Sequence, residues 1–168
     1  MEGTGGVSTF ALQFAKAAGA RVIASSSSDE KLDRATRLGA DEVINYRTTP
    51  DWGVRAAEIA GGGVDHVVEV GGPATLDQAL AAVRYGGEVA LVGVLTGFAG
   101  PINTGTILMK AINLRGVYVG SVADLAAAIA SGVRPVIDET FAFDQADSAY
   151  ARLRSGAHFG KVAVAVGI

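Results

Sequence analysis

Short apolar runs alternate with amphipathic segments along most of this chain. Small and apolar residues recur at helical spacing from Val7 to Ala18, and Gly19 ends that run. The next apolar run, residues 21–25, is rich in β-branched residues, as expected of a buried parallel strand. Asp29 is then expected to cap a helix that continues to Gly39. The first forty residues therefore predict a helix, a strand and a crossover helix.

The same alternation continues to the end of the chain. We expect strands at 42–45, 64–70, 87–93, 113–119, 136–137 and 161–166, and helices at 52–60, 73–83, 125–130 and 144–153, with an irregular stretch around 97–101 that has room for a short helical turn. This pattern predicts an α/β fold, a three-layer Rossmann-type doubly wound parallel sheet with helices on both faces. One domain accommodates all 168 residues.

A glycine-rich segment, Gly3 to Ser8, opens the first helix. Gly3 and Gly5 match the first two glycines of the dinucleotide-binding fingerprint, and Ser8 takes the third position, where a small residue permits close packing. Such a turn lets backbone N–H groups approach a diphosphate at the positive end of a helix. A tight turn explains the glycines equally well, but the helix and strand that follow favour dinucleotide binding.

The strand that normally precedes this fingerprint has almost no sequence here. Only Met1 and Glu2 come before Gly3, whereas the first strand usually lies in the centre of the sheet. We therefore expect a sheet that lacks its first, central strand, with unpaired backbone groups on both neighbours. Exchange between chains is one way to close such a gap.

The end of the second expected strand bears on the choice of nucleotide. Ser25 to Ser28 stand where NAD-binding domains carry an Asp or Glu for the adenosine ribose. Hydroxyls can donate to a 2′-phosphate, and Lys31 adds a positive charge one helical turn on. The sequence thus favours NADP over NAD and disfavours an S-adenosylmethionine methyltransferase, which needs the same acid. The alternative is a polar turn that caps the next helix, with Lys31 solvated.

Composition excludes several classes of protein. The net charge is −3 and the basic residues are scattered, so we expect no nucleic acid partner. Without cysteine there is no disulfide, thiolate nucleophile or Cys-ligated zinc, and His66 and His158 are too far apart in the sequence to suggest a metal site. We see no leader-like segment and no apolar run of about 20 residues, so we expect a cytoplasmic protein without membrane contact.

Five segments resemble, in order, the zinc-type alcohol dehydrogenase superfamily, the medium-chain dehydrogenases and reductases that include quinone oxidoreductases. They are GTGGVSTFALQFAKAAGARVIA, LGADEVINYR, GVDHVVEVGG, GGEVALVGV and HFGKVAV. The resemblance covers essentially the whole chain but only the family's cofactor domain. Family members carry their catalytic groups, and any zinc, mainly in a preceding GroES-like domain. The resemblance therefore implies that this domain is absent, that zinc, if used, belongs to it, and that the isolated chain is inactive.

The resemblance also implies individual cofactor contacts, for each of which ordinary strand-end packing is the alternative. Tyr46 matches the tyrosine of the INYR motif in NADP-using members. The implied contacts are Gly3, Thr4, Gly5, Gly6 and Val7 for the diphosphate; Ser26, Ser27, Lys31 and Tyr46 for the 2′-phosphate; Val70, Gly71, Gly93, Val94 and Leu95 along the adenosine and nicotinamide path; Val119, Gly120 and Ser121 at the carboxamide; and Phe159 and Lys161 from the FGK segment.

The implied activity is hydride transfer between the nicotinamide and a small alcohol, carbonyl, quinone or enone substrate. We expect no catalytic residue in this chain: His158 is read as an exposed strand-end residue, and Asp65, His66 and Glu69 as groups with local hydrogen bonds. A different hypothesis is a non-catalytic nucleotide-binding or dimerisation module. The apolar strand at 113–119 favours a homodimer formed edge to edge.

Overall fold

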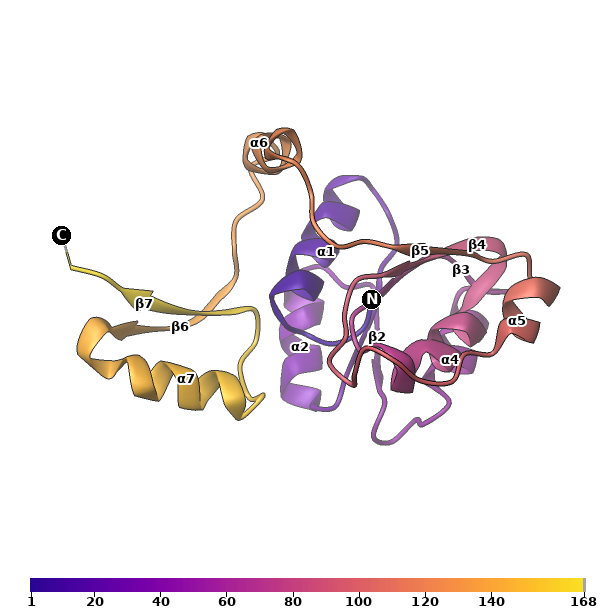
Figure 1. Cartoon of the computed structure of the whole chain (residues 1–168), viewed down its shortest axis with the longest axis horizontal. Coiled ribbons are helices and arrows are strands. Elements are labelled where there is room, and N and C mark those ends of the chain that lie inside the picture. The colour runs from indigo at the N-terminus through magenta and orange to yellow at the C-terminus, as the bar shows by residue number, and fades with distance from the viewer. Residues whose placement is uncertain (168) are drawn as a thin grey trace.

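The computed structural model describes residues 1–167 and has an α/β architecture (Figure 1). In every strand pair the two strands run parallel, as predicted. In chain order the elements are α1 (Gly6–Ala17), β1 (Ile23–Ser26), α2 (Asp29–Arg37), β2 (Glu42–Asn45), α3 (Trp52–Ile59), β3 (Val64–Glu69), α4 (Pro73–Ala82), β4 (Val83–Leu91), α5 (Thr104–Met109), β5 (Asn113–Gly116), α6 (Val122–Ala130), β6 (Ile137–Ala142), a 3₁₀ turn (Phe143–Gln145), α7 (Ala146–Arg154) and β7 (Lys161–Ala165).

The strands form three groups, β1-β2, β3-β4-β5 and β6-β7. Met1 and Glu2 connect the first two groups. The Met1 ammonium group donates to the Ile23 carbonyl at 2.9 Å, and Ser25 N donates to the Met1 carbonyl at 3.1 Å. Glu2 N donates to the Val68 carbonyl at 3.4 Å. Met1 and Glu2 therefore occupy part of the central position that we expected to be empty, and no strand among residues 1–167 lies in the rest of it.

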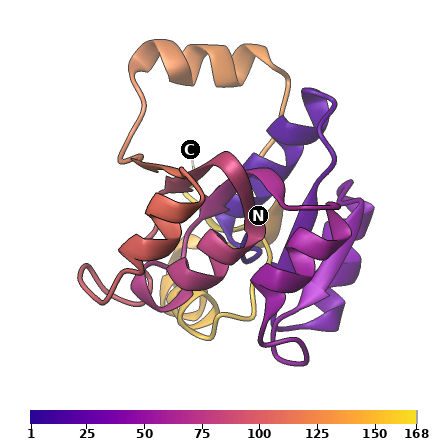
Figure 2. The ribbon, with the colours of Figure 1, turned by 90° about the vertical axis from the view of Figure 1, so that its right-hand side faces the viewer.

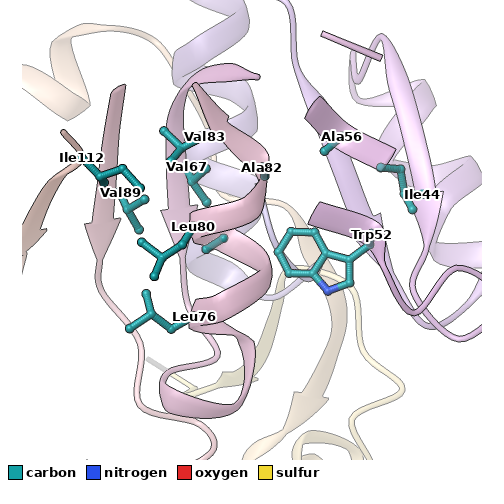
Figure 3. Packing of buried hydrophobic residues seen from close by; sticks show 11 residues of the cluster. Ile44, Trp52, Ala56, Val67, Leu76, Leu80, Ala82, Val83, Val89 and Ile112 are labelled. Atoms are coloured by element: carbon teal, nitrogen blue, oxygen red, sulfur yellow. The ribbon is translucent and has the colours of Figure 1, made fainter. Parts of the chain in front are cut away.

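The larger apolar core lies between β3, β4 and the helices that cover them. Figure 3 shows Leu76 and Leu80 of α4 beside Val67 and Val89 of the sheet, with the Trp52 indole of α3 on the other side of α4. Pro73 is tolerated in the first turn of α4, because an N–H group at that position would have no acceptor within the helix. A second cluster joins α1, β1 and α2 and includes Leu12, Val22, Ala24, Ala35, Ala40 and Phe159.

The last third of the chain departs from the single sheet that the alternation predicted. Strands β6 and β7 pair with each other and, with α7, form a separate unit beside α2 (Figure 1). Helix α6 stands away from the rest of the molecule (Figure 2), and none of its residues is buried. None of the helices in residues 1–167 is long and apolar enough to cross a membrane.

Several expected boundaries moved for identifiable reasons. Ser28, not Asp29, is the N-cap of α2, because its hydroxyl accepts a hydrogen bond from Lys31 N at 3.4 Å. Helix α5 lies just beyond the irregular stretch and begins where the Asn103 side chain caps it. Strand β5 ends at Gly116 because its pairing with β4 ends there, so residues 117–119 are not part of the strand.

Candidate nucleotide-binding site

The glycine loop brings unoccupied backbone donors to the carboxyl edge of the strands. Gly5 is the N-cap of α1 and, having no side chain, leaves the first N–H groups of the helix without a side-chain cap. Gly3 has φ +70°, a conformation that favours glycine. The buried Ser8 hydroxyl donates to the Glu2 carbonyl at 2.6 Å, which explains how serine serves at the third fingerprint position. The loop thus presents backbone amides at a helix end that has no side-chain cap.

Lys161 crosses the same helix end from the last strand. Gly160 N donates to the Thr4 carbonyl at 2.9 Å, and Gly5 and Gly160 form an isolated parallel bridge. The Lys161 side chain consequently lies over Gly6, where an added Cβ would be 3.1 Å from Nζ. An ammonium group beside the positive end of a helix is unfavourable unless an anion lies close to both. The loop and Lys161 together therefore place an ammonium group beside helix amides that have no side-chain cap.

A buried glutamate fixes the turn that follows β3. The carboxylate of Glu69 accepts hydrogen bonds from Gly71 N and Gly72 N at 2.9 Å and from the Thr75 hydroxyl at 2.5 Å. The side chain is fully buried. This confirms the expectation of local hydrogen bonds for Glu69. No sequence pattern indicated that Glu69 would shape the edge of the site.

Glu2 lies beside this glutamate, at the base of the glycine loop. Burial and the neighbouring Glu69 raise the pKa of Glu2 to about 8, so Glu2 is largely protonated at neutral pH. Its Oε2 is buried without a hydrogen-bond partner among the described residues. A proton on Glu2 removes the repulsion between the two adjacent buried carboxyl groups, so we expect the contacts of Met1 and Glu2 to depend on pH.

The residues predicted along the cofactor path lie in two sets. The residues of the first set lie close together around Val70. A Cβ atom added to Gly3 would be 3.8 Å from Val70 Cγ2, and Gly93 packs directly on the Val70 backbone. Thr96 N donates to the Gly71 carbonyl at 2.8 Å and holds the two strand ends together. Val94 and Leu95 follow Gly93 in the chain and are exposed. The second set lies between β5 and α6 and is exposed as well; it consists of Val119, Gly120 and Ser121.

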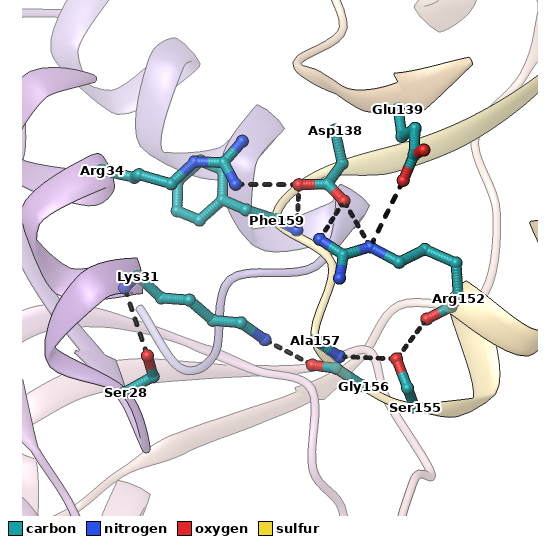
Figure 4. A network of polar contacts seen from close by, with 10 residues as sticks. All are labelled: Ser28, Lys31, Arg34, Asp138, Glu139, Arg152, Ser155, Gly156, Ala157 and Phe159. Atoms are coloured by element: carbon teal, nitrogen blue, oxygen red, sulfur yellow. Dashed lines mark hydrogen bonds and ion pairs between the residues drawn. The ribbon is translucent and has the colours of Figure 1, made fainter.

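The residues predicted for the 2′-phosphate follow β1 and β2. Tyr46 N donates to the Ser26 carbonyl at 3.0 Å, so these two residues are adjacent. Ser26 is buried, Ser27 is half-buried, and the side chain of Tyr46 is partly exposed. The ammonium group of Lys31 instead donates a hydrogen bond to the Gly156 carbonyl (Figure 4). The structure thus brings Ser26 and Tyr46 together and shows Lys31 engaged elsewhere.

The same view shows a charged network that sequence reasoning missed (Figure 4). The Asp138 carboxylate, 2% exposed, accepts from Arg34 at 2.8 Å, from Arg152 at 2.7 Å and from Phe159 N at 3.1 Å. Arg34 also lies 4.5 Å above the ring of Phe159, which is itself buried in the second core cluster. The Phe159 side chain is therefore part of the core, and the network places Gly160 and Lys161 beside the glycine loop.

In residues 1–167, no group of three His, Asp or Glu side chains lies close enough together to hold a metal ion. His158 is partly buried beside Lys31, and both burial and that positive charge lower its pKa. The side chains described here do not fit a zinc ion.

Comparisons with known proteins agree with this geometry. The family described as zinc-binding dehydrogenase matches residues 6–134. A zinc-type alcohol dehydrogenase-like protein of Schizosaccharomyces pombe is 46% identical over 98% of this chain and 50% of its own length. A crystal structure described as a candidate alcohol dehydrogenase of Sinorhizobium meliloti has a TM-score of 0.90 at 43% identity, covering 98% of this chain and 49% of its own. For an NAD-dependent alcohol dehydrogenase the TM-score is 0.86 at 30% identity, covering 99% and 51%.

These matches also define how much of each relative is represented. The chain spans about half the length of the curated relatives that it matches. The half of each relative that matches this chain contains the glycine loop and the parallel strands described above. The alignment to the Sinorhizobium meliloti structure includes nearly every residue of this chain. The fold assignment made from the sequence is therefore confirmed.

Proposed function

Because the chain belongs to the zinc-binding dehydrogenase family, we propose that its glycine loop binds the diphosphate of a nicotinamide dinucleotide. The observation that carries the proposal is the position of Lys161 over Gly6, beside helix amides that have no side-chain cap. Thr4, Gly5, Gly6 and Val7 would supply backbone contacts, and Lys161 would supply the charge. Gly3 would keep the turn narrow.

We further propose that the dinucleotide is NADP. The end of β1 carries Ser26 and Ser27 and no carboxylate that would repel a 2′-phosphate, and Tyr46 lies next to Ser26. Lys31 would have to exchange its Gly156 carbonyl for the phosphate, a change that is favourable because a phosphate is an anionic acceptor. The remaining strand ends, with Val70, Gly71, Gly93, Val94, Leu95, Val119, Gly120 and Ser121, would line the path to the nicotinamide.

The proposed role of the chain is that of the cofactor platform of an oxidoreductase. A bound nicotinamide supplies a hydride donor or acceptor at its C4 position. The residues of this chain would fix where that ring lies, and we assign the polarisation of a carbonyl, alcohol, quinone or enone substrate to groups outside these 168 residues. The alternative remains a non-catalytic nucleotide-binding module.

A binding experiment tests these proposals. NADPH and NADH are titrated separately into the protein and followed by nicotinamide fluorescence. Removing a charge-assisted contact costs about 1.5–3 kcal/mol, so we expect Lys161→Gln to weaken NADPH binding by about 10- to 100-fold. Lys16→Gln, at the far end of α1, is the matched control. Absence of binding by either nucleotide contradicts the platform, and unchanged affinity in Lys161→Gln contradicts the proposed contact of Lys161.

The choice of nucleotide has its own variants. Ser27→Asp introduces the missing carboxylate, and we expect it to weaken NADPH binding and strengthen NADH binding. Ser27→Asn introduces a side chain with the shape of aspartate but without its charge, and this variant should retain the NADPH preference. Equal affinities of the unmodified protein for the two nucleotides would contradict the proposed NADP preference while leaving the diphosphate site intact.

We also propose that two copies associate through the β5 edge. Strand β5 is the last strand of its sheet, and the chain beyond it exposes Tyr118 and Val119 with 95% and 76% of their surfaces accessible. Leu108 and Met109 of α5 are exposed as well. Exposed apolar residues at a strand edge favour pairing with a second chain. Sedimentation of the protein and of Tyr118→Lys tests this, and a monomer at all concentrations contradicts it.

A further inference from the structure

Asn45, the last residue of β2, connects the two segments that carry the proposed 2′-phosphate contacts. Its Nδ2 group donates to Oδ1 of Asp29, the first residue of α2, at 2.6 Å. Its Oδ1 atom accepts a hydrogen bond from Arg47 N at 3.0 Å. One side-chain amide therefore links the first turn of α2 with the turn that follows β2.

The main chain of Asn45 holds the same turn. Its carbonyl oxygen accepts a hydrogen bond from Thr49 N at 2.9 Å. Asn45 is also the register partner of Ser26 on β1, and Tyr46 N donates to the Ser26 carbonyl at 3.0 Å. The turn is thus fixed to β1, to α2 and to its own main chain, and it presents the exposed side chains of Tyr46 and Arg47.

Few side chains can make both contacts of this amide. The carboxylate of Asp29 can only accept a hydrogen bond, and the backbone N–H of Arg47 can only donate one. An amide offers a donor and an acceptor a short distance apart, whereas an aspartate in place of Asn45 would lack the donor. A hydrogen bond to a carboxylate is also stronger than one between neutral groups. The local chemistry therefore requires asparagine, and its two partners fix which way the amide points.

We propose that Asn45 is a positioning residue for the choice of nucleotide, an inference that rests on the proposed NADP site. By tying the Asp29 carboxylate to the end of β2, the amide keeps this negative charge from turning towards the hydroxyls of Ser26 and Ser27. By holding the turn, it keeps Tyr46 next to Ser26. A 2′-phosphate depends on both effects, because a nearby carboxylate repels it and hydroxyl groups bind it. NADH lacks this phosphate and depends on neither.

Nucleotide titrations of the whole chain measure this role. Asn45→Ala removes both side-chain hydrogen bonds, and the loss of one hydrogen bond usually changes an equilibrium by about fivefold. We therefore expect NADPH to bind at least about fivefold more weakly and NADH to bind as before. Asn113→Ala is the matched control, because Asn113 donates to the Glu88 carboxylate at 3.4 Å at the amino end of β5. This control should change neither affinity.

An exchange of the two side chains tests the contact itself. Asn45→Asp retains the acceptor for Arg47 N but sets two carboxylates against each other, so we expect weaker NADPH binding than in Asn45→Ala. Adding Asp29→Asn restores a donor and an acceptor with their roles exchanged, and this double variant should regain NADPH affinity to within about threefold of the unmodified protein. Phosphorus NMR is the second readout: the resonance of the bound 2′-phosphate should shift in Asn45→Ala and not in Asn113→Ala.

The outcomes distinguish this inference from the proposed NADP site. A protein that prefers NADPH and keeps the same preference in Asn45→Ala overturns the role of Asn45 and leaves the NADP site in place. Equal weakening of both nucleotides also overturns it, because a purely structural role acts on both. A lack of NADPH preference in the unmodified protein contradicts the NADP site and this inference together. If Asn45→Ala does not fold, failure of Asp29→Asn to rescue Asn45→Asp overturns the proposal.

Discussion

Residues 1–116 and residues 117–167 are stabilised in different ways. The first region contains two apolar clusters in which Leu12, Ala24 and Leu80 are completely buried. In the second region, among the residues described, only Ala149, Phe159 and Gly160 are buried. That region is attached chiefly by charged groups around Asp138 and by the Phe159 ring. Apolar packing therefore defines the first region, and a polar network positions the second.

The strongest way to break this contrast is to remove a core side chain. We expect Leu80→Ala to lower the free energy of unfolding by about 2–5 kcal/mol, because Leu80 is fully buried and its loss leaves a cavity. Leu108→Ala, at an exposed position of α5, should change it by less than about 0.5 kcal/mol. Chemical denaturation measures both. Similar values for the two variants would mean that the cluster around α4 does not stabilise the first region.

The next effect concerns the network that holds the second region. Asp138→Asn leaves Arg34 and Arg152 without their shared carboxylate, and we expect a cost of about 3 kcal/mol, at the low end for a buried pair because both arginines are partly exposed. Residues 131–136 should become more susceptible to limited proteolysis. Asp65→Asn, which breaks an exposed pair with Arg84, is the control and should cost less than about 1 kcal/mol. Unaltered proteolysis in Asp138→Asn would show that the unit is held by other contacts.

A third test uses the opposite titration of one buried carboxyl group in each region. The pKa of Glu2 is raised to about 8 by burial and by Glu69, so its stabilising contribution is present below about pH 4.5 and is lost as the pH rises towards 8. Burial raises the pKa of Asp138, but hydrogen bonds from its arginine partners outweigh this and lower it to about 2. Its contribution is present above about pH 3.8 and is lost as the pH falls towards 2.

Thermal melting across this pH range separates the two carboxyl groups. We expect Glu2→Gln to be more stable than the unmodified protein by about 1–3 kcal/mol near pH 9 and equal to it near pH 4, because the amide carries no charge to bury. Asp138→Asn should lose its deficit at acid pH instead. A Glu2→Gln variant that follows the unmodified protein at every pH would show that Glu2 is not the group responsible.

The smallest effect is expected on α6. Leu125→Ala and Ile129→Ala remove side chains that are 60% and 65% exposed, so each should change stability by less than about 0.5 kcal/mol. The exposed apolar surface of Leu125 and Ile129 should instead promote association of the unmodified protein. We therefore expect less light scattering from the variant that carries both substitutions. A stability loss comparable to that of Leu80→Ala would mean that α6 packs on the protein in solution.

Local sequence patterns predicted the elements well and their partners poorly. The first helix and the strand at 42–45 were correct, because spacing and residue size decide them locally. Helix α5 was missed, since its six residues carry too weak a periodic signal. The separate β6-β7 unit was missed because strand alternation does not reveal which strands pair.

The candidate site shows the same limit. The glycine loop was found from its spacing, but the crossing of Lys161 over Gly6 depends on a contact between the two ends of the chain. Lys31 was predicted to reach the ribose region, and no local pattern indicated that the Gly156 carbonyl would take its ammonium group. Contacts of this range depend on tertiary structure, and so the individual cofactor contacts remain predictions.

The two-residue bridge made by Met1 and Glu2 also has a mechanical consequence. Ser26 ends β1 and Tyr46 follows β2, whereas Val70 follows β3 and Gly93 lies beyond β4, so the two pairs of residues belong to separate groups of strands. Along the line between these groups, the backbone hydrogen bonds among the described residues come from Met1 and Glu2. A ligand long enough to contact both groups acts as a brace across that line. Binding of such a ligand would stiffen the sheet across that line. A shorter fragment that contacts only one group of strands would not stiffen it.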